Sequence, residues 1–134
     1  MPSFSQTSQQ RLNICHEKLQ RIFNEVIKNY DCTILVGYRT PAEQEKCYKT
    51  GKSKLKYGHH NNFPATAVDV SPWPIPKEWG AKDWKERAKF YYFAGFVKAT
   101  AQSMNIKLRW GGDWNDNKDF SDQTFDDLVH FELV

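Results

Sequence analysis

The residues of this chain that are best suited to chemistry are its histidines and a few carboxylates near strand-like segments. His59 and His60 stand in a loop-like segment, Asp69 lies near the end of the apolar run that follows, and His130 opens the last apolar run. A catalytic zinc ion takes three imidazole or carboxylate ligands and leaves one position for water. Two histidines and one carboxylate meet this demand, with His59 and His60 as alternatives for one ligand.

Strand alternation can present such ligands on one face. Side chains of a strand point alternately to its two sides, so the valines of AVDV can face a core while Asp69 points out of it. In HFELV the same alternation puts His130 and Glu132 on one face and Phe131 on the other. An aspartate in a buried-looking strand is costly unless it is paired or bound to a metal ion.

Asp127 precedes His130 by three residues in DDLVH, so its carboxylate can lie beside a ligand without being one. From there it can accept a proton from a metal-activated water that attacks a carbonyl, and pass the proton to the leaving amine. Zinc lowers the pKa of water to about 7, so a carboxylate is a sufficient base. Asp126 is the adjacent competitor, and spacing alone leaves both open.

A second oxygen-rich pattern lies between the last two apolar runs. Asp113, Asn115 and Asn117 alternate as the first ligands of a calcium loop do. An EF-hand is excluded, because Lys118 stands in place of the required glycine and Thr124 in place of the glutamate. A looser Ca²⁺ site remains a hypothesis beside an ordinary solvated loop.

Composition restricts the class of protein. The 134 residues suit one domain over 1–134, and 40% hydrophobic and 15% aromatic residues suffice for a core. The net charge of +3 comes with scattered Lys and Arg residues, which argues against a nucleic-acid-binding protein. No apolar run approaches a membrane span and no signal peptide is apparent, so we expect a soluble cytoplasmic chain, and we expect a monomer. Three cysteines without a CxxC pair argue against a disulfide framework.

Hydrophobic periodicity predicts the elements that must position these residues. After a frayed start over residues 1–7, helices are expected over 8–28, 41–49 and 83–104, strands over 32–38, 65–70, 107–110 and 130–134, and loops over 50–64 and 111–126. Thr40 and Pro41 are typical of a helix start. His16 is expected on the polar face of the first helix as a bystander. Helices and strands do not alternate regularly, which favours an α+β fold.

Two segments resemble the metal motifs of the zinc peptidase family that includes the VanX and VanY D-alanyl-D-alanine peptidases and the phage L-alanyl-D-glutamate endolysins. HHNNFPATAVDVSPWP resembles the first motif and DLVHFEL the last. The resemblance implies that His60, Asp69 and His130 bind zinc and that Asp127 is the catalytic base.

Two further segments, GYRTPAEQ and WGGDW, extend the resemblance over residues 34–134. The arginine of the first lies at the substrate site in the family, which implies that Arg39 binds or polarises the scissile carbonyl. A fixed cation there would stabilise the charge that develops in the transition state. We also expect Gln44, Trp110 and Trp114 to contact substrate, with simple packing as the alternative for the two tryptophans.

The resemblance implies a small antiparallel sheet flanked by helices, as in the hedgehog/DD-peptidase fold. It implies a zinc-dependent endolysin that hydrolyses the L-alanyl-D-glutamate bond of peptidoglycan stem peptides and stays in the host cytoplasm until it is released to the cell wall. A D-alanyl-D-alanine carboxypeptidase would use the same chemistry and is an alternative. A non-catalytic, zinc-containing wall-binding module is an alternative of another class, but a structural site has no need of Asp127.

Overall fold

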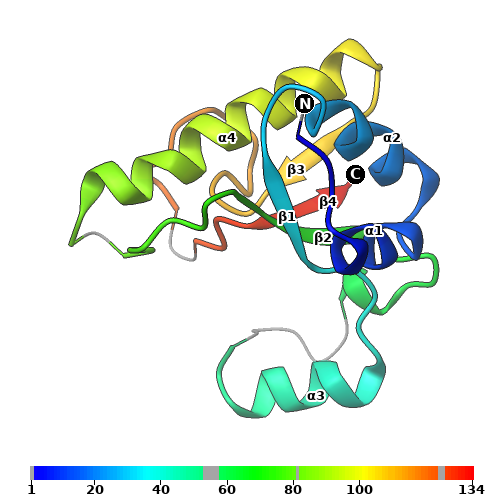
Figure 1. The fold of residues 1–134 in the computed structure, drawn as a ribbon. Helices are drawn as coiled ribbons and strands as arrows, with labels where there is room; N and C mark the ends of the chain where they lie inside the picture. The colour runs from blue at the N-terminus through cyan, green and yellow to red at the C-terminus, as the bar shows by residue number, and fades with distance from the viewer. Residues whose placement is uncertain (1, 53–57, 81, 124–125) are drawn as a thin grey trace.

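A four-stranded antiparallel sheet organises the chain (Figure 1). The computed structural model describes residues 2–52, 58–80, 82–123 and 126–134. The strands lie in the order β1-β2-β4-β3, with bounds β1 Cys32–Val36, β2 Ala67–Pro72, β3 Leu108–Trp110 and β4 His130–Leu133. The helices are α1 Gln6–Asn13, α2 Glu17–Val26, α3 Pro41–Lys49, α4 Trp84–Ser103 and the short 3₁₀ helix η1 His59–Asn61. The α+β class with a small antiparallel sheet is confirmed.

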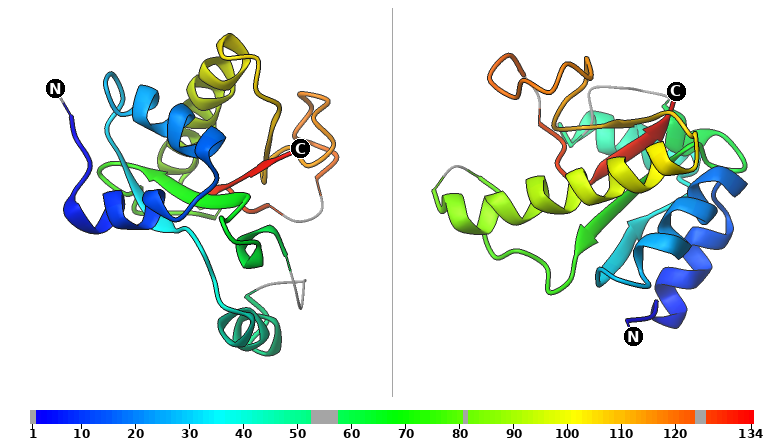
Figure 2. Two further views of the ribbon diagram at one scale, coloured as in Figure 1. Left: turned by 90° about the vertical axis from the view of Figure 1, so that its right-hand side faces the viewer. Right: turned by 90° about the horizontal axis from the view of Figure 1, so that it is seen from above.

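The core lies between the sheet and the helices α2 and α4 (Figure 2). Phe131 of β4 is fully buried, and its ring centroid lies 5.6 Å from that of Phe23 on α2 and 6.2 Å from that of Phe93 on α4. Val68 and Val70 of β2 are also fully buried. The predicted alternation is therefore present in both strands, and each turns its polar residues to the other face.

The helix expected over 8–28 is two helices in the structure, so this prediction was wrong. Between them, Cys15 forms a β-bridge with Ala65, and the His16 backbone N–H donates to the Ala65 carbonyl at 2.7 Å. The His16 ring then accepts a hydrogen bond from the Lys18 N–H at 3.1 Å and caps α2. His16 is thus a cap and not a bystander. Its contacts also tie the segment after η1 to the N-terminal helices.

The bounds of α3 are the predicted ones, and those of the other predicted helices and strands differ by at most two residues. The expected frayed start is shorter, because α1 begins at Gln6 and Ser5 accepts a hydrogen bond from the Ser8 N–H at 3.1 Å. The loop expected over 50–64 contains η1, and its residues 53–57 lie outside the described part. No helix within the described ranges is long and apolar enough to cross a membrane.

Helix α3 stands apart from the sheet (Figures 1 and 2). Its predicted start is confirmed: the Glu43 N–H donates to Thr40 Oγ1 at 3.1 Å, and the Thr40 N–H donates to Glu43 Oε1 at 3.0 Å. Gln44 is the only residue of α3 that is buried. The cap thus fixes where the helix begins, and its one buried residue lies next to the candidate site.

Two glycines allow backbone segments to approach each other around the site. A Cβ atom on Gly37 would collide with the backbone of Arg11, and one on Gly111 would collide with the backbone of Asp127. Gly111 also donates its N–H to the His130 carbonyl at 2.8 Å and accepts from the Asp127 N–H at 2.9 Å. The end of β3 is thereby bonded to the segment that carries the predicted base Asp127 and the predicted ligand His130.

Replacing Phe131 tests whether its ring anchors the sheet to the helices. We expect Phe131→Ala to lower the free energy of unfolding by about 3–5 kcal/mol, because a buried aromatic side chain is lost and a cavity is left. Tyr92→Ala is the control, since Tyr92 is 75% exposed, and it should cost less than about 1 kcal/mol. Urea unfolding followed by circular dichroism measures both, and equal losses would contradict the prediction.

Candidate active site

The pairing of β2 with β4 brings the first two candidate ligands together. Asp69 and His130 are directly opposite each other in the antiparallel register. Side chains at such positions start from Cβ atoms only about 5 Å apart. Asp69 Oδ1 lies 3.3 Å from His130 Nδ1, and the two side chains are 13% and 10% exposed. The strand pairing alone therefore places a carboxylate against an imidazole.

The third candidate ligand, His60, comes from η1. Its Nε2 lies 3.1 Å from Asp69 Oδ1. Two contacts hold η1 against the end of β1: the His60 carbonyl accepts from the Arg39 N–H at 2.8 Å, and the His60 Nδ1 lies 2.8 Å from the Gly37 carbonyl oxygen. Since a carbonyl oxygen can only accept, Nδ1 carries the hydrogen and the Nε2 lone pair faces Asp69.

These three residues fit a tetrahedral metal ion. One donor atom from each of His60, Asp69 and His130 lies within 4.8 Å of the others, and no other such group of His, Cys, Asp or Glu occurs among the described residues. Around zinc, with bonds of 2.0–2.1 Å, two donors of a tetrahedron are about 3.3 Å apart. The two separations from Asp69 Oδ1 are 3.1 and 3.3 Å, close to this tetrahedral spacing.

The structure places His60 at this group, and it places His59 outside it. The His59 ring is 43% exposed, with Nδ1 3.1 Å from Thr66 Oγ1 and Nε2 3.5 Å from Glu132 Oε2. Glu132 also lies 2.8 Å from the second nitrogen of His130, Nε2. No functional role was expected for Glu132, although strand alternation placed it on the face of His130. That alternation was the available signal.

The electrostatics of the group favour a cation. Burial by itself would raise the pKa of Asp69, but hydrogen bonds with His130 and His60 outweigh it and hold that pKa well below its usual range. Burial would lower the pKa of His130, but its hydrogen bonds with Asp69 and Glu132 raise it to about 9. Without a metal ion, the His130 ring therefore carries a proton on the nitrogen that faces Asp69. A metal ion that binds this nitrogen competes with that proton.

Asp127 lies beside the group, as predicted for a base. Its Oδ2 is 4.0 Å from His130 Nδ1. Its pKa is raised, first by burial and then by the negative charge of Asp69. The competitor Asp126 instead forms an ion pair with Arg87 at 2.6 Å, and it does not line the cavity at the site. The structure thus favours Asp127 over Asp126.

The predicted substrate residues divide into two groups. Arg39 donates through Nη1 to Gln44 Oε1 at 2.7 Å, and its Nη2 lies 3.9 Å from Asp69 Oδ2. The Trp114 ring lies 5.3 Å from the His130 ring. These three residues border the site. Trp110 does not: it is only 4% exposed and donates to a backbone carbonyl in the core. Its assignment as a substrate contact is corrected, because its indole packs in the protein interior.

A cavity of about 470 Å³ opens over the group. Its polar lining residues are Arg39, Gln44, Lys52, His59, His60, Asp69, Asp127, His130 and Glu132, and Trp79 and Trp114 add aromatic walls.

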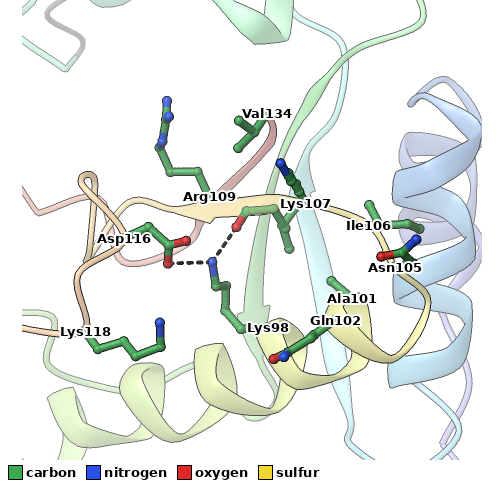
Figure 3. A pocket seen from close by; sticks show the side chains of 11 residues that line it. Lys98, Ala101, Gln102, Asn105, Ile106, Lys107, Arg109, Asp116, Lys118 and Val134 are labelled. Atoms are coloured by element: carbon green, nitrogen blue, oxygen red, sulfur yellow. Dashed lines mark hydrogen bonds and ion pairs between the residues drawn. The ribbon is translucent and has the colours of Figure 1, made fainter.

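A larger cavity of about 520 Å³ lies between α4, β3 and the following loop (Figure 3). Its cations include Lys98, which bonds to the Leu108 carbonyl and to Asp116. None of the predicted site residues lines it. We therefore place the active site in the smaller cavity.

The candidate calcium residues form hydrogen bonds within their own loop. Asp113 accepts from the N–H groups of Asn117 and Lys118 at 3.3 and 2.9 Å. Asn115 Oδ1 accepts from Gln123 Nε2 at 3.2 Å, and Asn117 Oδ1 accepts from the Asp119 N–H at 2.9 Å. These oxygens stabilise the loop directly, and Ca²⁺ binding here stays a prediction.

Comparisons with known proteins identify the family of the chain. The family of phage L-alanyl-D-glutamate peptidases matches residues 2–134. The L-alanyl-D-glutamate peptidase of Escherichia phage T5 is 29% identical over 138 residues, which cover 98% of this chain and 97% of the phage protein. The crystal structure of the Serratia marcescens L-Ala D-Glu endopeptidase ChiX has the same fold, with a TM-score of 0.70, 24% identity, and 99% and 91% coverage. The chain belongs to the phage L-alanyl-D-glutamate peptidase family.

Proposed function

We propose that this chain is a zinc-dependent endolysin that hydrolyses the L-alanyl-D-glutamate bond of peptidoglycan stem peptides. The observation that carries the proposal is the convergence of His60, Asp69 and His130, with Asp127 beside them, in a chain of this family. The name of the phage T5 relative supports the choice of bond. A closed structural metal site would not need the acid group or the open cavity above it.

Each residue at the site has a distinct task in this reaction. His60, Asp69 and His130 would hold a zinc ion, which would supply Lewis-acid chemistry for the peptide carbonyl and for the attacking water. Asp127 accepts the proton of the attacking water and delivers it to the leaving amine. The pKa of Asp127 is raised toward neutral pH, and this helps both proton transfers, because a group with such a pKa can both accept and donate a proton.

Arg39 stabilises the negative charge that develops on the carbonyl oxygen. Gln44 holds its guanidinium through the 2.7 Å hydrogen bond, and the capped start of α3 holds Gln44. Trp114 offers an aromatic wall for the substrate next to His130. We further propose that the chain acts as a monomer and reaches the wall from the host cytoplasm, as an endolysin does.

The products of digestion test the proposed function directly. With zinc present, we expect the purified protein to release peptides with new amino-terminal D-glutamate from peptidoglycan, as detected by mass spectrometry. Release of terminal D-alanine would instead identify a carboxypeptidase. A zinc-loaded protein that cleaves neither bond, in an assay where a known peptidase is active, would be a non-catalytic module.

Asp127→Asn tests the base. The amide keeps the size of the side chain but cannot accept the proton, so we expect kcat to fall by about 10²–10⁴-fold while zinc content is unchanged. Asp126→Asn is the matched control, because this neighbour contacts Arg87 and lies outside the cavity lining. It should stay within a few-fold of wild type. Equal effects of the two variants on kcat would refute the assignment.

His60→Ala and His59→Ala test the ligand assignment. We expect His60→Ala to lose zinc and activity, because a ligand is removed, whereas His59→Ala should still bind one zinc ion per chain. Elemental analysis after dialysis against metal-free buffer measures the zinc content. Zinc lost from His59→Ala and kept by His60→Ala would reverse the assignment.

A further inference from the structure

We propose that Glu132 is a positioning residue that fixes the His130 imidazole for metal binding, and that Arg109 and His59 hold the Glu132 carboxylate in place. The inference rests on the proposed metal centre and extends it to three residues outside the ligand set. Its two anchors come from elements other than β4, namely β3 and η1.

The contact between Glu132 and His130 determines which nitrogen of the ring is free. Glu132 Oε1 lies 2.8 Å from His130 Nε2, and the two residues share one face of β4. A carboxylate can only accept, so the hydrogen is on Nε2. A neutral imidazole then presents the lone pair of Nδ1, and Nδ1 is the atom that faces Asp69 at 3.3 Å. Glu132 thus selects the tautomer and the ring orientation that a metal ion requires.

The second oxygen of Glu132 is held from two sides. Oε2 lies 3.3 Å from Arg109 Nη1 and 3.5 Å from His59 Nε2. Arg109 and Glu132 are directly opposite each other in the β3–β4 register. Figure 3 shows the Arg109 side chain turned away from the Lys98–Asp116 pair on the far side of β3. Arg109 therefore points to Glu132, while the nearby Asp116 pairs with Lys98.

This arrangement explains a buried charge and an otherwise unassigned histidine. The Glu132 side chain is only 9% exposed, and an isolated carboxylate at such a position is costly. A purely structural ion pair would account for that burial, but it would not predict an effect on zinc affinity in a folded variant. The two explanations can therefore be separated by measurement.

The test compares zinc affinity with folding. For Glu132→Ala we expect zinc affinity, measured by competition with a chromogenic chelator, to fall by about 10–100-fold while circular dichroism shows a folded chain. Glu132→Gln keeps a carbonyl acceptor for Nε2–H and should recover most of the affinity. Glu25→Ala is the control, because Glu25 lies on α2 and forms an exposed ion pair with Lys28, and it should bind zinc as wild type does.

Arg109→Ala and His59→Ala should each weaken zinc binding by several-fold. In the Glu132→Ala background they should have no further effect, because they act through that carboxylate. A folded Glu132→Ala protein with wild-type zinc affinity would overturn the inference. If Glu132→Ala does not fold, Arg109→Ala decides, and unchanged zinc affinity in that variant would overturn it equally. Failure of the wild-type chain to bind zinc would instead refute the proposed function, and the inference with it.

Discussion

The site depends on the antiparallel pairing of β2 with β4. This register sets Asp69 opposite His130, so a carboxylate and an imidazole meet without any contribution from a loop. The same two strands turn Val68, Val70 and Phe131 to the core. Because alternation couples the two faces, a shift of one residue would bury the ligands and expose the core. The packing of Phe131 against the helices therefore also maintains the geometry of the candidate metal site.

The position of the third candidate ligand depends on tertiary contacts outside the sheet. His60 belongs to a 3₁₀ turn whose position is set by hydrogen bonds to Gly37 and Arg39, and the chain just after it is tied to Cys15 and His16. The interruption between α1 and α2 thus has a clear role. It gives up continuous helical hydrogen bonds and uses the freed backbone groups to anchor the segment that follows His60.

Charge is concentrated around the site in a way that one divalent cation relieves. Asp69, Asp127 and Glu132 crowd three carboxylates near His130, and the negative charge of Asp69 contributes to the raised pKa of Asp127. Arg39, which follows β1, approaches Asp69, and Arg109 of β3 approaches Glu132. A metal ion at the three donors would neutralise part of this charge, and Asp127 would lie beside it, in the position proposed for the base.

The sequence by itself determined the elements and the identity of the chemical groups. Periodicity located helices and strands to within one or two residues, apart from the break at Cys15, and alternation put His130 and Glu132 on one face. Spacing could not choose between His59 and His60, nor could it show that Trp110 is buried in the core. These features depend on contacts between segments far apart in the chain. Only the tertiary structure decided them, because the direction of a side chain in a loop is set by the groups that bind it and not by its neighbours in sequence.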